Sequence, residues 1–262
     1  MPAFGEAYRV YGGNTSCFTV NTDTGNIIFD AGTGISFAAE TLSNQPQPLP
    51  ITMLFTHFHM DHLIGLPSFA PLYNKKANIQ IMADPERDDD WKKTLKTIVG
   101  KPYWPVGLAE TDAAMNLVDL PADKCSLNLY GIEISWFRVP HPQGCIAYRV
   151  NMPGKDIVIA TDVEYREDDI DPAFINFCAT ADCLIFDAQY TPKEYLSHSG
   201  WGHSTWKVAV RAAIEAKVQK LVLTHHEPVR KDKDIESIVE DARKLFPETH
   251  AATENMLLHS SK

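Results

Sequence analysis

The sequence predicts an α/β fold in which two mixed β-sheets stack face to face with helices outside, a four-layer αββα sandwich. Two observations predict it. Strand-like segments in the first part of the chain follow one another as hairpins, whereas those in the second part alternate with helical patterns. The 262 residues, 44% of them hydrophobic, suffice for one large core, so we expect a single domain over residues 1–262.

The expected elements follow from hydrophobic periodicity and from turn residues. Strands are expected at 7–11, 17–20, 27–30, 51–56, 78–82, 132–139, 145–150, 156–160, 183–186 and 221–224. Helices are expected from 84 through 98, at 204–216 and at 234–245. The glycines near residues 12 and 32 are interpreted as ordinary sharp turns.

Composition and charge narrow the class of partner. The formal net charge is −10, and such a surface repels long polyanions, since Lys and Arg contacts to phosphate dominate nucleic-acid affinity. A small substrate is therefore favoured over a long nucleic acid. The five cysteines are odd in number and never spaced C-x-x-C, which argues against a disulfide framework and a thiolate metal site.

The chain also shows no signal of membrane insertion or export. No run of about eighteen apolar residues is present, and the first six residues lack the basic and then apolar pattern of a signal peptide. We expect no membrane partner and a cytoplasmic location.

One short motif points to metal chemistry. His57, His59, Asp61 and His62 lie within six residues, directly after the apolar strand expected at 51–56. Histidine is the commonest ligand of borderline metals, and a carboxylate beside three histidines suits a hydrolytic site better than a structural zinc site. The ends of strands are where α/β folds carry their chemistry.

Further ligands are expected at later strand ends. His141 follows the strand at 132–139 between two prolines that fix its loop, and Asp162 follows the strand at 156–160, where a carboxylate has two oxygens to offer. The strand at 221–224 delivers His225 and His226 together. A two-metal hydrolase holds its cations about 3.5–4 Å apart and needs a ligand set of this size.

With these residues the chain resembles the metallo-β-lactamase superfamily, whose fold is the αββα sandwich. Gly202-His203-Ser204-Thr205, after Asp187, is similar to its phosphodiesterase branch, which holds the tRNA 3′-processing endonucleases (RNase Z) and small cyclic-phosphate diesterases. The resemblance implies two divalent cations, zinc by default with manganese or iron as alternatives. It implies one cation on His57, His59 and His141, a second on Asp61, His62 and His225, and Asp162 as the bridge. His226 departs from the pattern and is assigned a supporting or substrate role.

The resemblance also implies the reaction. A hydroxide bridging the cations attacks phosphorus, Asp61 orients this nucleophile, and His203, held by Asp187, protonates the leaving alkoxide. We therefore expect a phosphodiesterase that hydrolyses a small phosphodiester such as a cyclic nucleotide or a cyclic sugar phosphate. His203 also sits at a good helix start, where Ser204 or Thr205 is the cap.

Several alternatives stay open. A tRNA 3′-processing endonuclease is one, although the long basic arm of the RNase Z enzymes has no counterpart here, and a lactonase or thioesterase is another. Relatives commonly form homodimers, so the resemblance allows a homodimer. Tyr103, Trp104 and Trp201 are candidates either for stacking on a base or for packing. The remaining histidines singled out are interpreted as ordinary surface or core residues: His198, His250 and His259.

Overall fold

Residues 1–45, 47–86 and 90–258 are described by the structure, a computed structural model. They fall into two units, each with its own sheet and its own core. The first unit consists of Met1–Pro2 and Asn14–Lys124, and the second of Ala3–Gly13 and Cys125–Lys262. Each is described separately below.

The first unit is built on a five-stranded sheet with the strand order β1-β2-β3-β4-β5. Strands β1 and β2 form an antiparallel hairpin, and the following strands pair in parallel. The strands are β1 (Phe18–Asn21), β2 (Asn26–Phe29), β3 (Ile51–Leu54), β4 (Asn78–Ala83) and β5 (Ala114–Asp119). The helices are α1 (Ile35–Ser43) and α2 (Trp91–Ile98), with 3₁₀ turns at Met60–His62, Leu66–Ser68, Ala70–Tyr73 and Leu108–Glu110.

Apolar residues of β2, β3 and β4 form the core of the first unit. Strands β2 and β3 are buried along their whole length, as expected of parallel strands that are covered on both faces. Helix α2 contributes Trp91 and Leu95, which are four residues apart and therefore lie on one face of the helix.

The second unit is built on a seven-stranded sheet with the order β12-β11-β10-β9-β8-β7-β6. Strands β6 to β9 run as an antiparallel meander, and β9 to β12 pair in parallel. The strands are β6 (Ser126–Leu129), β7 (Ile132–Val139), β8 (Cys145–Met152), β9 (Lys155–Ala160), β10 (Cys183–Asp187), β11 (Leu221–Thr224) and β12 (Thr249–Ala251). The helices are α3 (Pro172–Cys178), α4 (Pro192–Tyr195), α5 (Trp206–Glu215) and α6 (Asp232–Arg243), with a 3₁₀ turn at Glu6–Tyr8.

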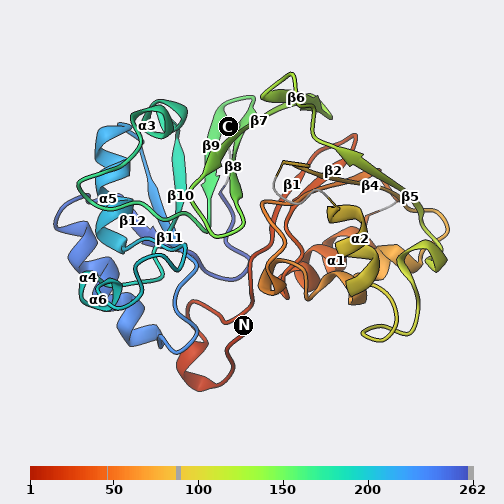
Figure 1. Ribbon diagram of the computed structural model, residues 1–262, viewed down its shortest axis with the longest axis horizontal. Helices are drawn as coiled ribbons and strands as arrows, with labels where there is room; N and C mark the ends of the chain where they lie inside the picture. Colours follow the sequence, from red (N-terminus) through yellow and green to blue (C-terminus); the bar gives the residue numbers. More distant parts are fainter. Residues whose placement is uncertain (46, 87–89, 259–262) are drawn as a thin grey trace. The chain divides into compact units, whose positions relative to one another are not determined.

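Helices α5 and α6 pack against the parallel part of this sheet, strands β10 to β12, and these elements are labelled in Figure 1. Val208, Ala209 and Ala212 of α5 are buried in the core that also holds Phe186 of β10. Thr205 begins α5, because its hydroxyl accepts a hydrogen bond from the backbone N–H of Val208. No helix in the described ranges is both long and apolar enough to cross a bilayer.

Most expected elements are confirmed, but one strand is wrong and one helix begins later than expected. The strand expected at 7–11 is instead a 3₁₀ turn followed by a loop. The backbone N–H groups of Val10 and Tyr11 donate to the carboxylate of Asp232, at the start of α6, and not to a neighbouring strand. The helix expected from 84 begins only at Trp91. Residues 84–86 are not helical, and the carboxylate of Asp84 accepts the backbone N–H of Glu86 at 3.1 Å, while 87–89 lie outside the described residues. His259 also lies outside them.

Candidate metal centre

Strand order places the first group of candidate ligands at one edge of the first unit's sheet. Strands β2 and β3 are parallel neighbours with Phe29 opposite Leu54, so the chain leaves both strands at the same edge. Asp30 follows β2 there, and Thr56 and His57 follow β3. The adjacent Met60–His62 turn carries Asp61 and His62.

Asp30 is buried at this edge, and its carboxylate accepts three hydrogen bonds. Its carboxylate accepts hydrogen bonds from the backbone N–H of Thr56 at 2.8 Å, from the Thr56 hydroxyl at 2.9 Å and from Nδ1 of His62 at 2.8 Å. Since the Thr56 hydroxyl donates to Asp30, it accepts from Nδ1 of His57, 3.0 Å away. Both histidines thus carry their proton on Nδ1, which leaves Nε2 as the nitrogen available to a metal ion.

The side chains of the motif gather closely. The ring of His57 lies 4.5 Å from that of His59 and 4.3 Å from that of His62, measured between centroids. Nε2 of His62 lies 3.6 Å from Oδ2 of Asp61. His57 and His62 are buried, and His59 and Asp61 are half-buried. The structure therefore brings together the four residues that the sequence singled out in this segment.

The second unit collects its candidate residues in the same way. Strands β9, β10 and β11 are parallel neighbours, and β7 runs parallel to β9, because both are antiparallel to β8. The residues that follow these four strands consequently meet at one edge of the sheet. They are His141 after β7, Asp162 after β9, Asp187 at the end of β10 and His225 after β11.

Asp162 and His225 form a close pair. Nε2 of His225 lies 3.1 Å from Oδ1 of Asp162, and the hydroxyl of Thr161 donates to the other carboxylate oxygen. Nδ1 of His225 donates to Oε1 of Gln189 at 3.1 Å, which again directs Nε2 toward the cluster. Asp162 and His225 both have a positive φ, 55° and 56°, a strained backbone that is typical of functional positions.

His141 is fixed by the loop that precedes α5. Its Nδ1 donates to the backbone carbonyl of Gly202 at 2.8 Å. Gly202 has a φ of 95°, and a Cβ at this position would lie only 2.3 Å from Nδ1 of His141. Glycine is therefore required here both by the backbone conformation and by the approach of the imidazole.

His203 and Asp187 form the pair that the sequence predicted. Nδ1 of His203 lies 2.7 Å from Oδ2 of Asp187, which is fully buried, and the His203 ring stacks on that of His225 at 4.8 Å between centroids. Asp187 also accepts the backbone N–H groups of Val163 and Gln189. Ligand atoms of His141, Asp162 and His203 all lie within 4.8 Å of one another, and so do those of Asp187, His203 and His225.

Three supporting residues escaped the sequence analysis. Asp30 orients His62, and Gln189 orients His225. The third is Glu164, whose carboxylate accepts the Tyr195 hydroxyl at 2.8 Å and the backbone N–H groups of Gly200 and Gly202 at 2.6 Å each. Asp30 offered a usable signal, because it ends an apolar strand as Asp162 and Asp187 do. Glu164 and Gln189 offered none, since their partners are distant in the sequence.

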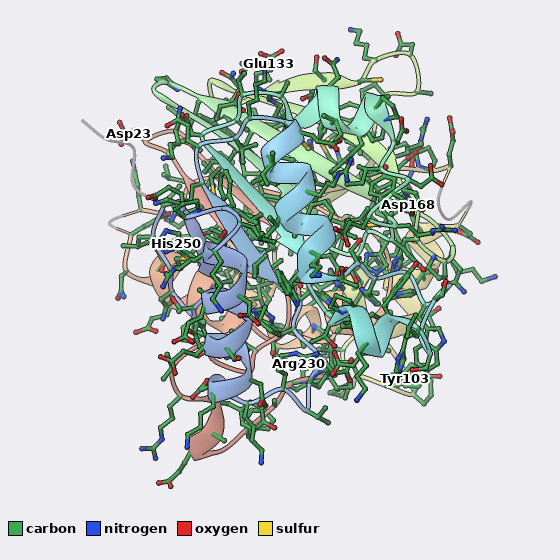
Figure 2. The ribbon with its side chains drawn as sticks, turned by 90° about the vertical axis from the view of Figure 1, so that its left-hand side faces the viewer. Asp23, Tyr103, Glu133, Asp168, Arg230 and His250 are labelled. Atoms are coloured by element: carbon green, nitrogen blue, oxygen red, sulfur yellow. The ribbon has the colours of Figure 1, made fainter. Side chains whose placement is uncertain are left out.

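His226 differs from its neighbour His225. It joins none of the His/Asp groupings found in the described residues, and both of its ring nitrogens are buried. Burial, and then the nearby charge of Arg230, lowers the pKa of His226 to about 3. Arg230, labelled in Figure 2, donates to the carbonyl of Gln189 at 2.9 Å and to the carboxylate of Glu194 at 2.7 Å. His226 is thus a half-buried residue with a neutral imidazole, next to the candidate ligand His225.

The aromatic candidates have different environments. Trp104 is half-buried and donates from Nε1 to the Tyr73 hydroxyl at 2.8 Å, so it has a packing role. Tyr103 is 71% exposed and Trp201 is 63% exposed. Tyr103 belongs to the first unit and Trp201 to the second, two residues before His203.

The donor set fits divalent metal ions of the borderline class. Each unit supplies imidazole nitrogens together with carboxylate oxygens, a combination that suits zinc, manganese or iron. Within the described ranges, no thiolate belongs to these groups. Four of the imidazoles, His57, His62, His141 and His225, have Nδ1 bonded to an oxygen atom. This supporting arrangement is the one that metal-binding histidines need.

The sequence matches the family described as Beta-lactamase superfamily domain over residues 25–226, and the chain belongs to this superfamily. It is similar to the ribonuclease Z of Oceanobacillus iheyensis, with 27% identity over 274 residues, 87% of each chain. It is also similar to the ribonuclease Z of Lachnospira eligens, with 24% identity over 291 residues, 87% of this chain and 86% of the relative.

Solved structures confirm the metallo-β-lactamase sandwich fold. The Bacillus subtilis protein YhfI has a TM-score of 0.70 at 18% identity over 95% of this chain and 96% of that one. A diphosphatase of the PhnP family has a TM-score of 0.69 at 19% identity over 94% and 85%, and the short form of human tRNase Z has 0.65 at 18% over 100% and 97%. The protein is a metal-dependent hydrolase of this superfamily.

Proposed function

We propose that this protein is a dinuclear phosphodiesterase that hydrolyses a small phosphodiester, a cyclic nucleotide or a cyclic sugar phosphate. The pair of His203 and Asp187 carries the proposal, with 2.7 Å between Nδ1 and Oδ2. An alkoxide leaves phosphorus only with difficulty unless it receives a proton, and an imidazole held by a buried carboxylate is a suitable donor. The lactonase and thioesterase alternatives do not need this pair.

Two divalent ions, zinc by preference, are proposed as the cofactors. We propose His57, His59 and His141 as ligands of one ion, Asp61, His62 and His225 as ligands of the other, and Asp162 as the residue shared by both. Such ions polarise the phosphoryl group and lower the pKa of water. The oriented imidazoles and the mixed nitrogen and oxygen donors support this assignment.

Two side chains of the protein are proposed to carry out the proton transfers. Asp61 orients the attacking water and accepts its proton. Nε2 of His203 gives a proton to the leaving oxygen, because Nδ1 is occupied by Asp187.

The size of the substrate separates two candidate reactions. The net charge of −10 and the missing basic arm favour a small phosphodiester over a tRNA. The similarity to proteins named ribonuclease Z along 87% of the chain favours tRNA 3′-end processing as the second candidate. Cleavage of a long nucleic acid is therefore the weaker proposal, and the substrate panel has to include a tRNA.

A substrate panel tests the proposal. Protein with measured metal content is assayed against 2′,3′- and 3′,5′-cyclic nucleotides, a cyclic ribose phosphate, a precursor tRNA and a simple lactone. We expect hydrolysis of a cyclic phosphate. Cleavage of the tRNA alone supports the second candidate, and metal-loaded protein that cleaves no phosphodiester refutes both.

Leaving-group dependence tests the role of His203. His203→Ala is expected to lower the rate with an alkoxide leaving group by about 10²–10⁴-fold. The loss is expected to be much smaller with p-nitrophenolate, a stable anion that does not need the proton. His250→Ala changes a half-exposed histidine of β12 and is the matched control. An equal loss on both substrates, with metal retained, contradicts the proton-donor role.

Three broader features belong to the same proposal. We propose that residues 1–262 act as one hydrolase domain, that the protein works in the cytoplasm, and that it forms a homodimer. Light scattering of the purified protein tests the last of these.

A further inference from the structure

The segment between α4 and α5 presents one tryptophan to solvent. All five tryptophans of the chain are described, and Trp201 is the exposed one, at 63%. Trp91, Trp136 and Trp206 are buried. Tryptophan is usually well buried, because it has the largest apolar surface of any side chain, so an exposed indole beside a candidate active-site residue is informative.

The backbone around Trp201 is held on both sides. Gly200 and Gly202 both have a positive φ, 87° and 95°, and both donate their N–H groups to Glu164 at 2.6 Å. The N–H of Trp201 itself donates to the carbonyl of His198 at 3.1 Å. The indole is therefore presented by an ordered loop, and a ligand that binds it pays little conformational entropy for ordering the protein.

A series of ring contacts connects this indole to His203. Trp201 meets His198 edge to face at 4.9 Å between centroids, and His198 stacks on Tyr190 at 4.7 Å. Tyr190 in turn meets the edge of His203 at 6.1 Å. Nδ1 of His198 is bonded to the carbonyl of Glu194 at 2.8 Å, so the middle of the series is also fixed.

We propose that Trp201 is a stacking face for the nucleobase of the substrate, which makes a nucleoside phosphodiester the preferred class over a sugar phosphate without a base. The inference rests on the proposed function and specifies its substrate. Stacking requires no positive charge, so it works on a protein with a net charge of −10, and it accepts any base because every base has a π-face. Trp201 lies two residues from His203, and in a nucleotide one ribose separates base from phosphate.

Binding is measured first, because it does not depend on turnover. The intrinsic fluorescence of the metal-loaded protein is titrated with adenosine 5′-monophosphate and with ribose 5-phosphate. We expect the nucleotide to bind more tightly and to quench emission, and Trp201→Ala to weaken nucleotide binding about 5- to 150-fold. Trp201→Phe keeps an aromatic face and is expected to recover most of the affinity. Phe4→Ala removes an exposed aromatic side chain that has no assigned role and is the control.

Turnover gives the second readout. In Trp201→Ala, the ratio of kcat/KM for a cyclic nucleotide to kcat/KM for a cyclic ribose phosphate is expected to fall by the same factor. An unchanged ratio together with unchanged nucleotide binding overturns the inference. An equal loss of kcat/KM on both substrates, together with a change in the molecular mass of the protein in solution, also overturns the inference. That result assigns Trp201 to a contact with a second copy of the chain. Base-selective binding without any hydrolysis keeps the stacking site and refutes the proposed function instead.

Discussion

Nδ1 of His62 donates to Oδ2 of Asp30 at 2.8 Å, and both side chains are completely buried. The same carboxylate also holds Thr56 through its backbone and its hydroxyl. Asp30 thereby fixes the end of β3 to the end of β2 and orients an imidazole of the H-x-H-x-D-H motif. Its φ of 60° is a conformation that Asp and Asn tolerate better than most residues.

Replacing Asp30 by Asn is expected to weaken both folding and metal binding. Asn has the same shape and tolerates the same backbone, but its amide group cannot accept from all three donors. A buried donor without an acceptor costs about 1–3 kcal/mol, which should appear as a lower free energy of unfolding in a urea titration. Loss of the group that orients a metal-binding His lowers metal affinity about 10–100-fold.

Asp23→Asn is the control for this substitution, since Asp23 is exposed in the turn between β1 and β2. Asp23→Asn should match the wild type in both measurements. If Asp30→Asn binds zinc with wild-type affinity in a competition titration, Asp30 does not orient His62 for a metal.

The sequence predicted the candidate ligands more completely than the elements that support them. The candidate ligands follow apolar strands, and this local pattern was sufficient to place His141, Asp162 and His225 at strand ends. The strand expected at 7–11 failed because alternation is also compatible with a loop, and here Asp232, more than 200 residues away, takes the backbone N–H groups. Glu164 was missed for the same reason, because its partners at 195, 200 and 202 are set by tertiary structure.

Gly202→Ala is expected to displace His141. The added Cβ would meet the imidazole at 2.3 Å, in addition to the strain of a positive φ. We expect a loss of bound metal, measured by mass spectrometry of the purified protein, and at least a tenfold loss of hydrolysis, because a misplaced ligand disturbs the site.

Gly154→Ala is the control that separates backbone strain from displacement of a neighbouring side chain. Gly154 also has a positive φ, 75°, but a Cβ there would meet nothing within 4 Å. It should lower the free energy of unfolding by about 1 kcal/mol and leave the metal content unchanged. Equal metal content in Gly202→Ala and Gly154→Ala would show that Gly202 acts only through its backbone conformation.

Gln189→Leu is expected to lower metal affinity through His225. Oε1 of Gln189 accepts from Nδ1 of His225 at 3.1 Å, while its amide group donates to Glu227 at 2.8 Å, which fixes the orientation of the amide. Leucine keeps most of the volume but removes the acceptor. We expect about 10–100-fold weaker binding of the ion that His225 is proposed to hold, measured by titration against a chelating indicator.

Gln219→Leu is the matched control. Gln219 also uses its amide group to bind a carboxylate, that of Asp182 at 2.7 Å, but on the exposed surface. It should keep the affinity of the wild type for both ions. If Gln189→Leu keeps it as well, the contact with Gln189 does not set the tautomer of His225.

Thiol reactivity tests the interpretation of the cysteines as residues without a role in metal binding. Cys125 is exposed, whereas Cys145, Cys178 and Cys183 are buried, and burial raises the pKa of the Cys178 thiol and raises that of Cys183 to about 11. The pKa of Cys17 is raised too, first by burial and then by the charge of Asp30. Only the thiolate attacks a disulfide reagent, so at pH 8 a raised pKa makes these thiols slow in addition to inaccessible.

We expect one fast thiol per chain with Ellman's reagent, five after unfolding, and no fast thiol in Cys125→Ser. A second fast thiol in the native protein would contradict either the burial of Cys145, Cys178 and Cys183 or the raised pKa of Cys17. A loss of bound metal in Cys125→Ser would contradict the assignment of the metal centre to His and Asp alone.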